Sequence, residues 1–129
     1  MPGQIDTTYN GWSNYETWNV ALWLDNEPST YTETREAMRE AWNDHDMADP
    51  VTRDRTFFPT QSAAARYQFS MWLEEYVKDM QPDLGASVWS DLLGAALSEV
   101  NWYEIADNWL SELDGYESKD HHVRPSAAQ

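Results

Sequence analysis

The sequence predicts an all-α protein, a single-domain bundle of about five helices, on three observations. Apolar residues recur at helical spacing in several windows. No segment shows the strict alternation that is typical of a half-buried strand. The chain has 129 residues, of which 41% are hydrophobic, enough for one core. We therefore expect an irregular N-terminal lead-in, an acidic helical domain within residues 1–115 and a flexible tail over residues 116–129.

The first helix is expected to begin at Ser13, because Ser13 and Glu16 have the spacing of a capping box. From Trp18 to Leu24 apolar residues occupy nearly every direction around the helix axis. A helix that is apolar on all sides is usually buried, so this helix is predicted to lie inside the bundle. It is expected to end before Pro28.

A second helix is predicted over residues 31–43, where Thr30 and Glu33 have the capping-box spacing again. The stretch 44–60 contains two prolines and scattered charge, which favours a long loop.

Three further helices are predicted over residues 62–80, 86–100 and 101–114. Their apolar residues follow the i, i+3, i+4, i+7 series of amphipathic helices. Gly94 weakens the middle helix, and Asn101 with Glu104 is expected to cap the last one. The side chains predicted to face inward are Phe69, Trp72, Leu73, Tyr76, Val77, Met80, Val88, Trp89, Leu92, Leu93, Ala96, Leu97, Val100, Trp102, Ile105, Ala106, Trp109, Leu110 and Leu113.

Composition excludes several classes of function. The chain has no cysteine, so disulfides, thiolate catalysis and cysteine-bound zinc are ruled out. The first ten residues have neither a basic start nor an apolar run, and no segment has the roughly 20 apolar residues needed to cross a bilayer. We therefore expect a cytoplasmic protein with no membrane partner.

The charge balance is the most informative property of the composition. The chain has 23 acids against eight Lys and Arg, a net charge of −15. Such a surface repels nucleic acids and anionic membranes and attracts basic proteins. Direct nucleic-acid binding is thus disfavoured, and the expected partner is a basic nucleic-acid-binding protein or complex. Solubility and salt adaptation are the competing explanations of the same charge.

The acids are concentrated in the second half of the chain. Between Tyr67 and Ser118 there are eleven acids, and Lys78 is the only basic residue. On the predicted helices they lie opposite the apolar stripes and should point to solvent. Carboxylates three or four residues apart rise by about 4.5–6 Å along a helix, so a row of them could imitate DNA phosphates. An ordinary solvated surface is the alternative. The candidate partner-binding residues are Glu74, Glu75, Asp79, Asp91, Glu99, Glu104, Asp107 and Glu112.

Enzymatic and metal sites have weaker support. Asp44, His45, Asp46 and Asp49 could supply metal ligands, but neither the metalloprotease nor the EF-hand pattern is present, and a solvated loop is favoured. The adjacent His121 and His122 lie in the tail. There is no nucleophile elbow and no phosphate-binding glycine loop. The chain is therefore predicted to have no cofactor and no catalytic activity.

Three aromatic residues near element ends admit two interpretations. Tyr9, Trp12 and Trp42 could be exposed anchors for a partner, because Trp and Tyr are enriched at interface hot spots. Packing of these side chains onto the core is the interpretation that we favour.

Two stretches carry a family resemblance. Residues 11–27 (GWSNYETWNVALWLDNE) resemble the opening of a group of small uncharacterised proteins of bacteriophages, plasmids and related mobile elements. Residues 91–106 (DLLGAALSEVNWYEIA) resemble a second segment of that group. The resemblance implies a mobile-element origin and assigns no activity. Small acidic proteins of such elements include anti-restriction and anti-CRISPR inhibitors, an analogy of class. The expected function is thus inhibition of a host defence complex by DNA mimicry; the alternative is a small acidic scaffold or accessory protein.

Overall fold

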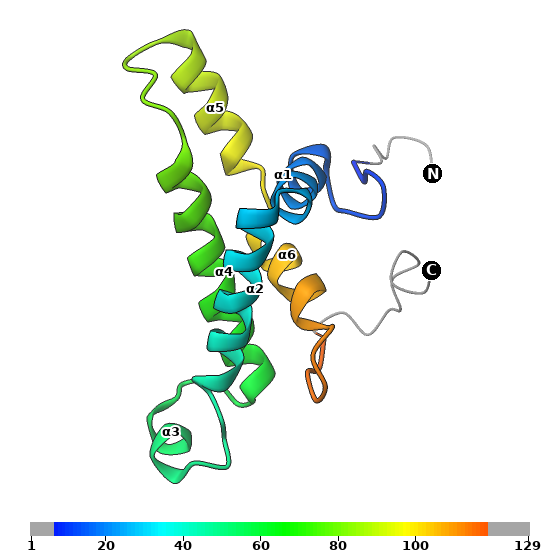
Figure 1. Ribbon diagram of the computed structural model, residues 1–129, viewed down its shortest axis with the longest axis vertical. Helices are drawn as coiled ribbons and strands as arrows, with labels where there is room; N and C mark the ends of the chain where they lie inside the picture. Colours follow the sequence, from blue (N-terminus) through cyan, green and yellow to red (C-terminus); the bar gives the residue numbers. More distant parts are fainter. Residues whose placement is uncertain (1–6, 119–129) are drawn as a thin grey trace.

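The computed structural model describes residues 7–118 as six helices (Figure 1). Within this range the β structure is a bridge between Tyr9 and Trp12, so the predicted all-α class is confirmed. The helices are α1 (Tyr15–Asn26), α2 (Pro28–Asn43), α3 (Pro50–Arg55), α4 (Gln61–Met80), α5 (Val88–Ser98) and α6 (Trp102–Leu110).

The longest helix, α4, forms the centre of the packing. It packs against α6 and α2, while α1 packs against α2 and α6. The helices α2 and α4 run antiparallel, because Gln61 at the start of α4 binds the Trp42 carbonyl and Tyr76 near its end binds Glu33. The core lies between these four helices. Its buried apolar members are Ala21, Leu24, Met38, Ala41, Ala65, Phe69, Leu73, Val100, Trp102, Ile105, Ala106, Trp109 and Leu110.

The start of α1 differs from the prediction. Asn14 is the N-cap, and its side-chain oxygen accepts the Thr17 amide at 2.9 Å. The Ser13 amide instead donates to the Glu104 carboxylate at 3.1 Å. The predicted capping box of Ser13 with Glu16 is therefore wrong, because a residue distant in sequence takes the amide that the box would have used.

The burial of α1 was also predicted wrongly. Thr17, Ala21 and Leu24 are its buried residues, whereas Leu22 and Trp23 are exposed. Only one side of α1 packs against α2 and α6, so apolar side chains on its other side stay exposed.

The second helix begins earlier than predicted. Pro28 is its first residue, where the missing amide costs nothing, and Glu27 is the N-cap. Thr30 lies within the first turn and donates to the Leu24 carbonyl at 2.8 Å. The predicted Thr30–Glu33 capping box is therefore wrong.

The predicted loop over residues 44–60 contains the short helix α3. Asp49 caps it by accepting the Val51 amide at 3.2 Å. Thr60 caps α4, whose start is one residue from the predicted position. Asn101 caps α6 by accepting the Glu104 amide at 3.0 Å, as expected.

The helix α5 differs most from expectation, since none of its residues is buried. Val88, Trp89 and Leu92 are exposed, although helical periodicity placed them inside. Leu93, Ala96 and Leu97 are partly buried. Periodicity predicts the existence of an apolar stripe, but it does not predict whether another helix covers the stripe. Met80, at the end of α4, is exposed for the same reason.

Candidate functional site

The surface of the described residues carries a large excess of negative charge. Of the 21 acids within residues 7–118, 17 are exposed. The same range contains six basic residues, and two of them, Arg35 and Arg66, are buried at 6% and 7% exposure. The ratio of acidic to basic residues is therefore higher on the surface of the described range than in its composition.

Five of the eight predicted binding residues are exposed, namely Glu75, Asp79, Asp91, Glu99 and Glu112. Glu75 and Asp79 lie four residues apart on α4. Glu112 follows α6 and its carboxylate is 3.8 Å from Arg35. Glu74 is partly buried, and Lys78 donates to its carboxylate at 2.7 Å.

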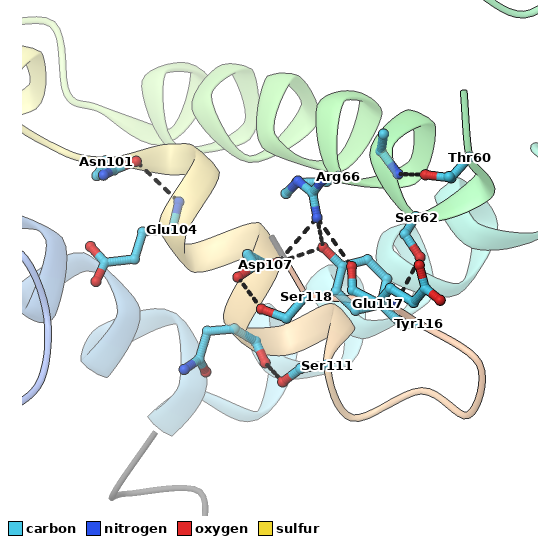
Figure 2. A network of polar contacts seen from close by, with 12 residues as sticks. Thr60, Ser62, Arg66, Asn101, Glu104, Asp107, Ser111, Tyr116, Glu117 and Ser118 are labelled. Carbon is cyan, nitrogen blue, oxygen red and sulfur yellow. Dashed lines mark hydrogen bonds and ion pairs between the residues drawn. The ribbon is translucent and has the colours of Figure 1, made fainter. Parts of the chain in front are cut away.

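Asp107 does not point to solvent, which corrects the prediction for this residue. Its side chain is 15% exposed and pairs with Arg66 at 3.2 Å. Tyr116 and Ser118 donate hydroxyl hydrogen bonds to the same carboxylate at 2.6 and 2.7 Å. Figure 2 shows these groups converging between α4 and α6. The charge of Asp107 therefore serves the fold, by compensating a buried guanidinium.

The same network holds the residues that follow α6. Arg66 also contacts the Tyr116 hydroxyl at 2.6 Å, and the Glu117 amide donates to Ser62 at 2.8 Å (Figure 2). Residues 116–118, where the flexible tail was predicted to start, are thus packed against α4. The rest of that tail, 119–129, lies outside the described residues.

Two pKa values are displaced in this network. Burial, and then the hydrogen bond to Asp107, raise the pKa of Tyr116 above its usual value. Burial lowers the pKa of Arg66, but the interactions with Tyr103 and Tyr116 outweigh it and raise that pKa overall. The phenol therefore stays neutral and the guanidinium stays charged at neutral pH, as a structural site requires.

Glu104 also has a structural contact. Both of its carboxylate oxygens accept the Ser13 amide, and this bond ties the lead-in to α6. A neighbouring bond, from the Asn101 amide to the Thr17 hydroxyl at 2.8 Å, joins α1 to the start of α6. Glu104 and Asp107 are therefore poor choices for a partner-binding surface.

The second buried cation, Arg35, lies between aromatic rings. Its guanidinium is 4.2 Å from the Trp109 ring centroid and 4.6 Å from that of Tyr31. It donates to Asp25 at 2.8 Å. Sequence reasoning did not predict that Arg35 and Arg66 are buried. The available signal was their position on the buried side of an amphipathic helix, since Arg66 precedes Phe69 by three residues and Arg35 precedes Met38 by three.

A further polar contact lies between α2 and α4. The Tyr76 hydroxyl donates a hydrogen bond to Glu33, and the Tyr76 ring stacks on Trp72 with centroids 4.5 Å apart. Partial burial, followed by the bond to Glu33, raises the pKa of Tyr76 to about 12. Glu33, Glu36 and Glu40 are exposed on α2, so α2 adds carboxylates to the surface that sequence reasoning assigned to later helices.

The candidate metal residues are engaged in contacts with other parts of the fold. Asp44 accepts from Gln68 at 2.9 Å, and His45 bonds the other amide atom of Gln68 at 2.7 Å. Asp49 caps α3. Among residues 7–118 no three His, Asp or Glu side chains are grouped as metal ligands. His121 and His122 lie outside the described residues.

The aromatic residues divide into packed and exposed groups. Trp12 and Trp42 pack against the core, which confirms the packing interpretation for these two residues. Tyr9 lies against Tyr15 and Trp18 but is 39% exposed, so it does not pack onto the core. Trp72, Trp102 and Trp109 contact the core, as predicted. The exposed indoles are instead those of Trp23 and Trp89.

One hollow lies between the end of α4 and α5. It is lined by Lys78, Asp79, Gln81, Asp83, Leu93 and Gly94, among others.

No helix in the described part of the chain is both long and apolar enough to span a membrane.

Comparison with known proteins relates the N-terminal part of the chain to a family model. A family model described as a family of unknown function (DUF7249) matches residues 5–53, which include the stretch 11–27, α1 and α2. The matched region covers less than half of the chain and carries no assigned activity. No curated protein and no solved structure matches.

Proposed function

We propose that this protein is a mobile-element inhibitor that binds a basic host complex handling nucleic acid, of the restriction or CRISPR type. It would act by DNA mimicry, placing surface carboxylates in a groove built for phosphates. The observation that supports this proposal is the excess of surface acids: 17 are exposed within residues 7–118 against four exposed basic residues, since Arg35 and Arg66 are buried. Ordinary soluble surfaces mix both signs.

The carboxylates available for this role are those without a structural contact. Among the predicted binding residues these are Glu75 and Asp79 on α4, Asp91 on α5 and Glu99 directly after α5. The pair Glu75–Asp79 is separated by about 6 Å along the axis, four residues at 1.5 Å each. Several such carboxylates, held on rigid helices, can replace phosphates in an electrostatic contact, which speeds association at low salt and weakens as salt rises.

The test compares two matched charge reversals. Glu75→Lys with Asp79→Lys changes the charge of α4, and Glu36→Lys with Glu40→Lys makes the same change on α2. Tagged wild-type protein and both variants are incubated with host lysate at low salt, with and without excess duplex DNA, and captured proteins are identified by mass spectrometry. The expected result is a nucleic-acid-binding complex that DNA displaces and that the α4 variant no longer captures.

Two results would contradict DNA mimicry. A partner that duplex DNA does not displace, or that all three proteins capture alike, would leave the acidity as a property of solubility. The second candidate, a small acidic scaffold or accessory protein without DNA mimicry, would then be preferred. It is favoured by the exposed apolar side chains Trp23 and Trp89, which mimicry of DNA phosphates does not require.

A further inference from the structure

The helix α5 stands apart from the bundle. Extensive helix packing connects α1, α2, α4 and α6, and α5 contributes no buried residue. Figure 1 shows it at the end of the molecule opposite to α3. No atom outside the helix backbone lies within 4 Å of where a Cβ on Gly94 would stand. The helix is therefore anchored mainly at its C-terminal end, where Leu97 packs on the core and Val100 is buried.

Half of the apolar side of α5 is uncovered. At about 100° per residue, Val88, Leu92 and Ala95 lie within about 60° of one another, and Trp89 adjoins Leu92. We call these four residues the α5 strip; all four are exposed, with Val88 at 62%, Trp89 at 66% and Leu92 at 58%. The partly buried Leu93 and Leu97 lie next to the strip on the side toward the bundle. The apolar surface thus continues outward from the core to solvent.

The charged residues of α5 and its C-cap that border the strip are acidic. Asp91 lies beside it and Glu99 follows Ala95 along the same line, both exposed. From Asp79 to Ser118 the chain has nine acids and no Lys or Arg. The ligand that fits must combine an apolar face with positive charge at its border.

A second copy of this chain fits poorly. It would bring the same acids to the border of the strip, and like charges across an interface oppose association. A stable interface buries about 800 Å² per partner, whereas one large aromatic residue supplies about 150–250 Å². The strip has one such residue, Trp89, beside the smaller Val88 and Leu92, so its apolar area falls short of that requirement. Attraction between opposite charges has to supply the remaining binding energy.

We infer that the α5 strip is a docking site for an amphipathic helix of a basic protein. The apolar side chains of the partner helix lie on Trp89 and Leu92, and its Lys or Arg residues face Asp91 and Glu99. This is the packing of one amphipathic helix on the apolar face of another. The inference rests on the proposed function in one respect, that the partner is basic, and it does not require the partner to bind DNA.

The test uses a synthetic amphipathic helix of Leu and Lys as the probe, with a fluorescent label. A second peptide, in which Ser replaces every Leu, has the same charge and no apolar face. Binding is measured by anisotropy at about 0.15 M salt, where charge attraction is screened beyond about 8 Å. Wild-type protein is expected to bind the Leu peptide at least about tenfold more tightly than the Ser peptide, a difference of about 1.4 kcal/mol.

The variant Trp89→Ser with Leu92→Ser should remove this preference. Both side chains are exposed, so the fold is expected to survive, and circular dichroism checks it. The matched control is Val51→Ser with Phe57→Ser, which removes exposed apolar groups at the α3 end, Phe57 being 100% exposed. The control should retain the preference. Equal peptide binding by the wild type and the α5 variant would overturn the inference.

Three further outcomes distinguish docking of a basic helix from dimer formation and from the proposed function. A wild-type dimer in sedimentation, absent in the α5 variant, would assign the strip to a second copy and overturn docking of a basic helix. A preference for the Leu peptide together with lysate partners that DNA does not displace would retain the docking site and overturn the DNA mimicry. If the α5 variant still captures a complex that DNA displaces, and no preference for the Leu peptide is seen, the DNA mimicry is retained and the docking site is overturned.

Discussion

Arg66 and Asp107 join α4 to α6 through an ion pair of 3.2 Å, with side chains 8% and 15% exposed. Asp107 is one of the eight acids that the sequence offered as a binding surface. Its position shows why counting acids overstates the charge available to a partner. Part of the negative charge neutralises buried arginines, and mutations of such residues would report on folding instead of binding.

We predict that Asp107→Ala destabilises the protein by about 3–5 kcal/mol, because it leaves the Arg66 guanidinium buried without its counter-charge. Urea denaturation at neutral pH measures the change. Asp54→Ala, at an exposed acid of α3, should change the stability by less than about 0.5 kcal/mol. Similar stability of the two variants would contradict a structural role for Asp107.

Glu104 gives a smaller and more local prediction. Glu104→Ala should cost about 1.5 kcal/mol, the lower end for hydrogen bonds to charged groups, since the contact with Ser13 is partly exposed. Hydrogen exchange of the Ser13 amide should accelerate, while exchange in the interior of α4 stays slow. Unchanged exchange at Ser13 would show that the bond contributes nothing in solution.

Local patterns predicted the helices better than their caps and their burial. The periodicity of Phe69, Leu73 and Tyr76 located α4, and Ile105 and Trp109 located α6, because in both helices the apolar stripe is covered. In α5 the same pattern failed for Trp89, since coverage depends on where the preceding turn directs the helix. The prediction of a capping box at Ser13 was wrong because Glu104, 91 positions away, accepts the hydrogen bond of the Ser13 amide. Contacts of that kind have no signature in the local sequence.

The stability of the protein should fall at alkaline pH through Tyr76. The folded-state pKa is about 12, above the ordinary value of about 10, so the folded state holds the phenol proton more tightly. This contribution is complete below pH 10 and is lost as pH rises to about 12. Tyr76→Phe should therefore lose less unfolding free energy than wild type over this window.

Absorbance of tyrosinate provides the check on Tyr76. The change that disappears in Tyr76→Phe should be centred near pH 12. If it is centred near pH 10, the hydrogen bond to Glu33 does not protect the phenol.

Asp79 is in an unfavourable position for an acid. It lies in the last turn of α4, where the helix dipole disfavours negative charge. Asp79→Lys should therefore raise the stability by about 0.3–1 kcal/mol at low salt, and the gain should shrink in high salt. Under the proposed function the same variant weakens partner capture. A variant that is both more stable and still competent in capture would remove Asp79 from the binding surface.

A substitution at Gly94 should change the stability of α5 without changing the side chains of the α5 strip. Gly94 is an exposed residue in the helix interior, with an ordinary negative φ and open space where a Cβ would stand. Glycine at such a position costs a helix about 0.5–1 kcal/mol relative to alanine. Gly94→Ala should therefore slow amide exchange across α5 with little effect on α4 or α6.

Binding of the Leu and Lys peptide should change little in Gly94→Ala, or tighten slightly. At about 100° per residue, Gly94 lies on the polar side of α5, away from Val88 and Leu92, so the added methyl group does not touch the strip. A more ordered helix would also lose less conformational freedom on binding. Marked weakening of peptide binding would mean that the partner approaches α5 over Gly94, and the docking face would then have to be moved to that side.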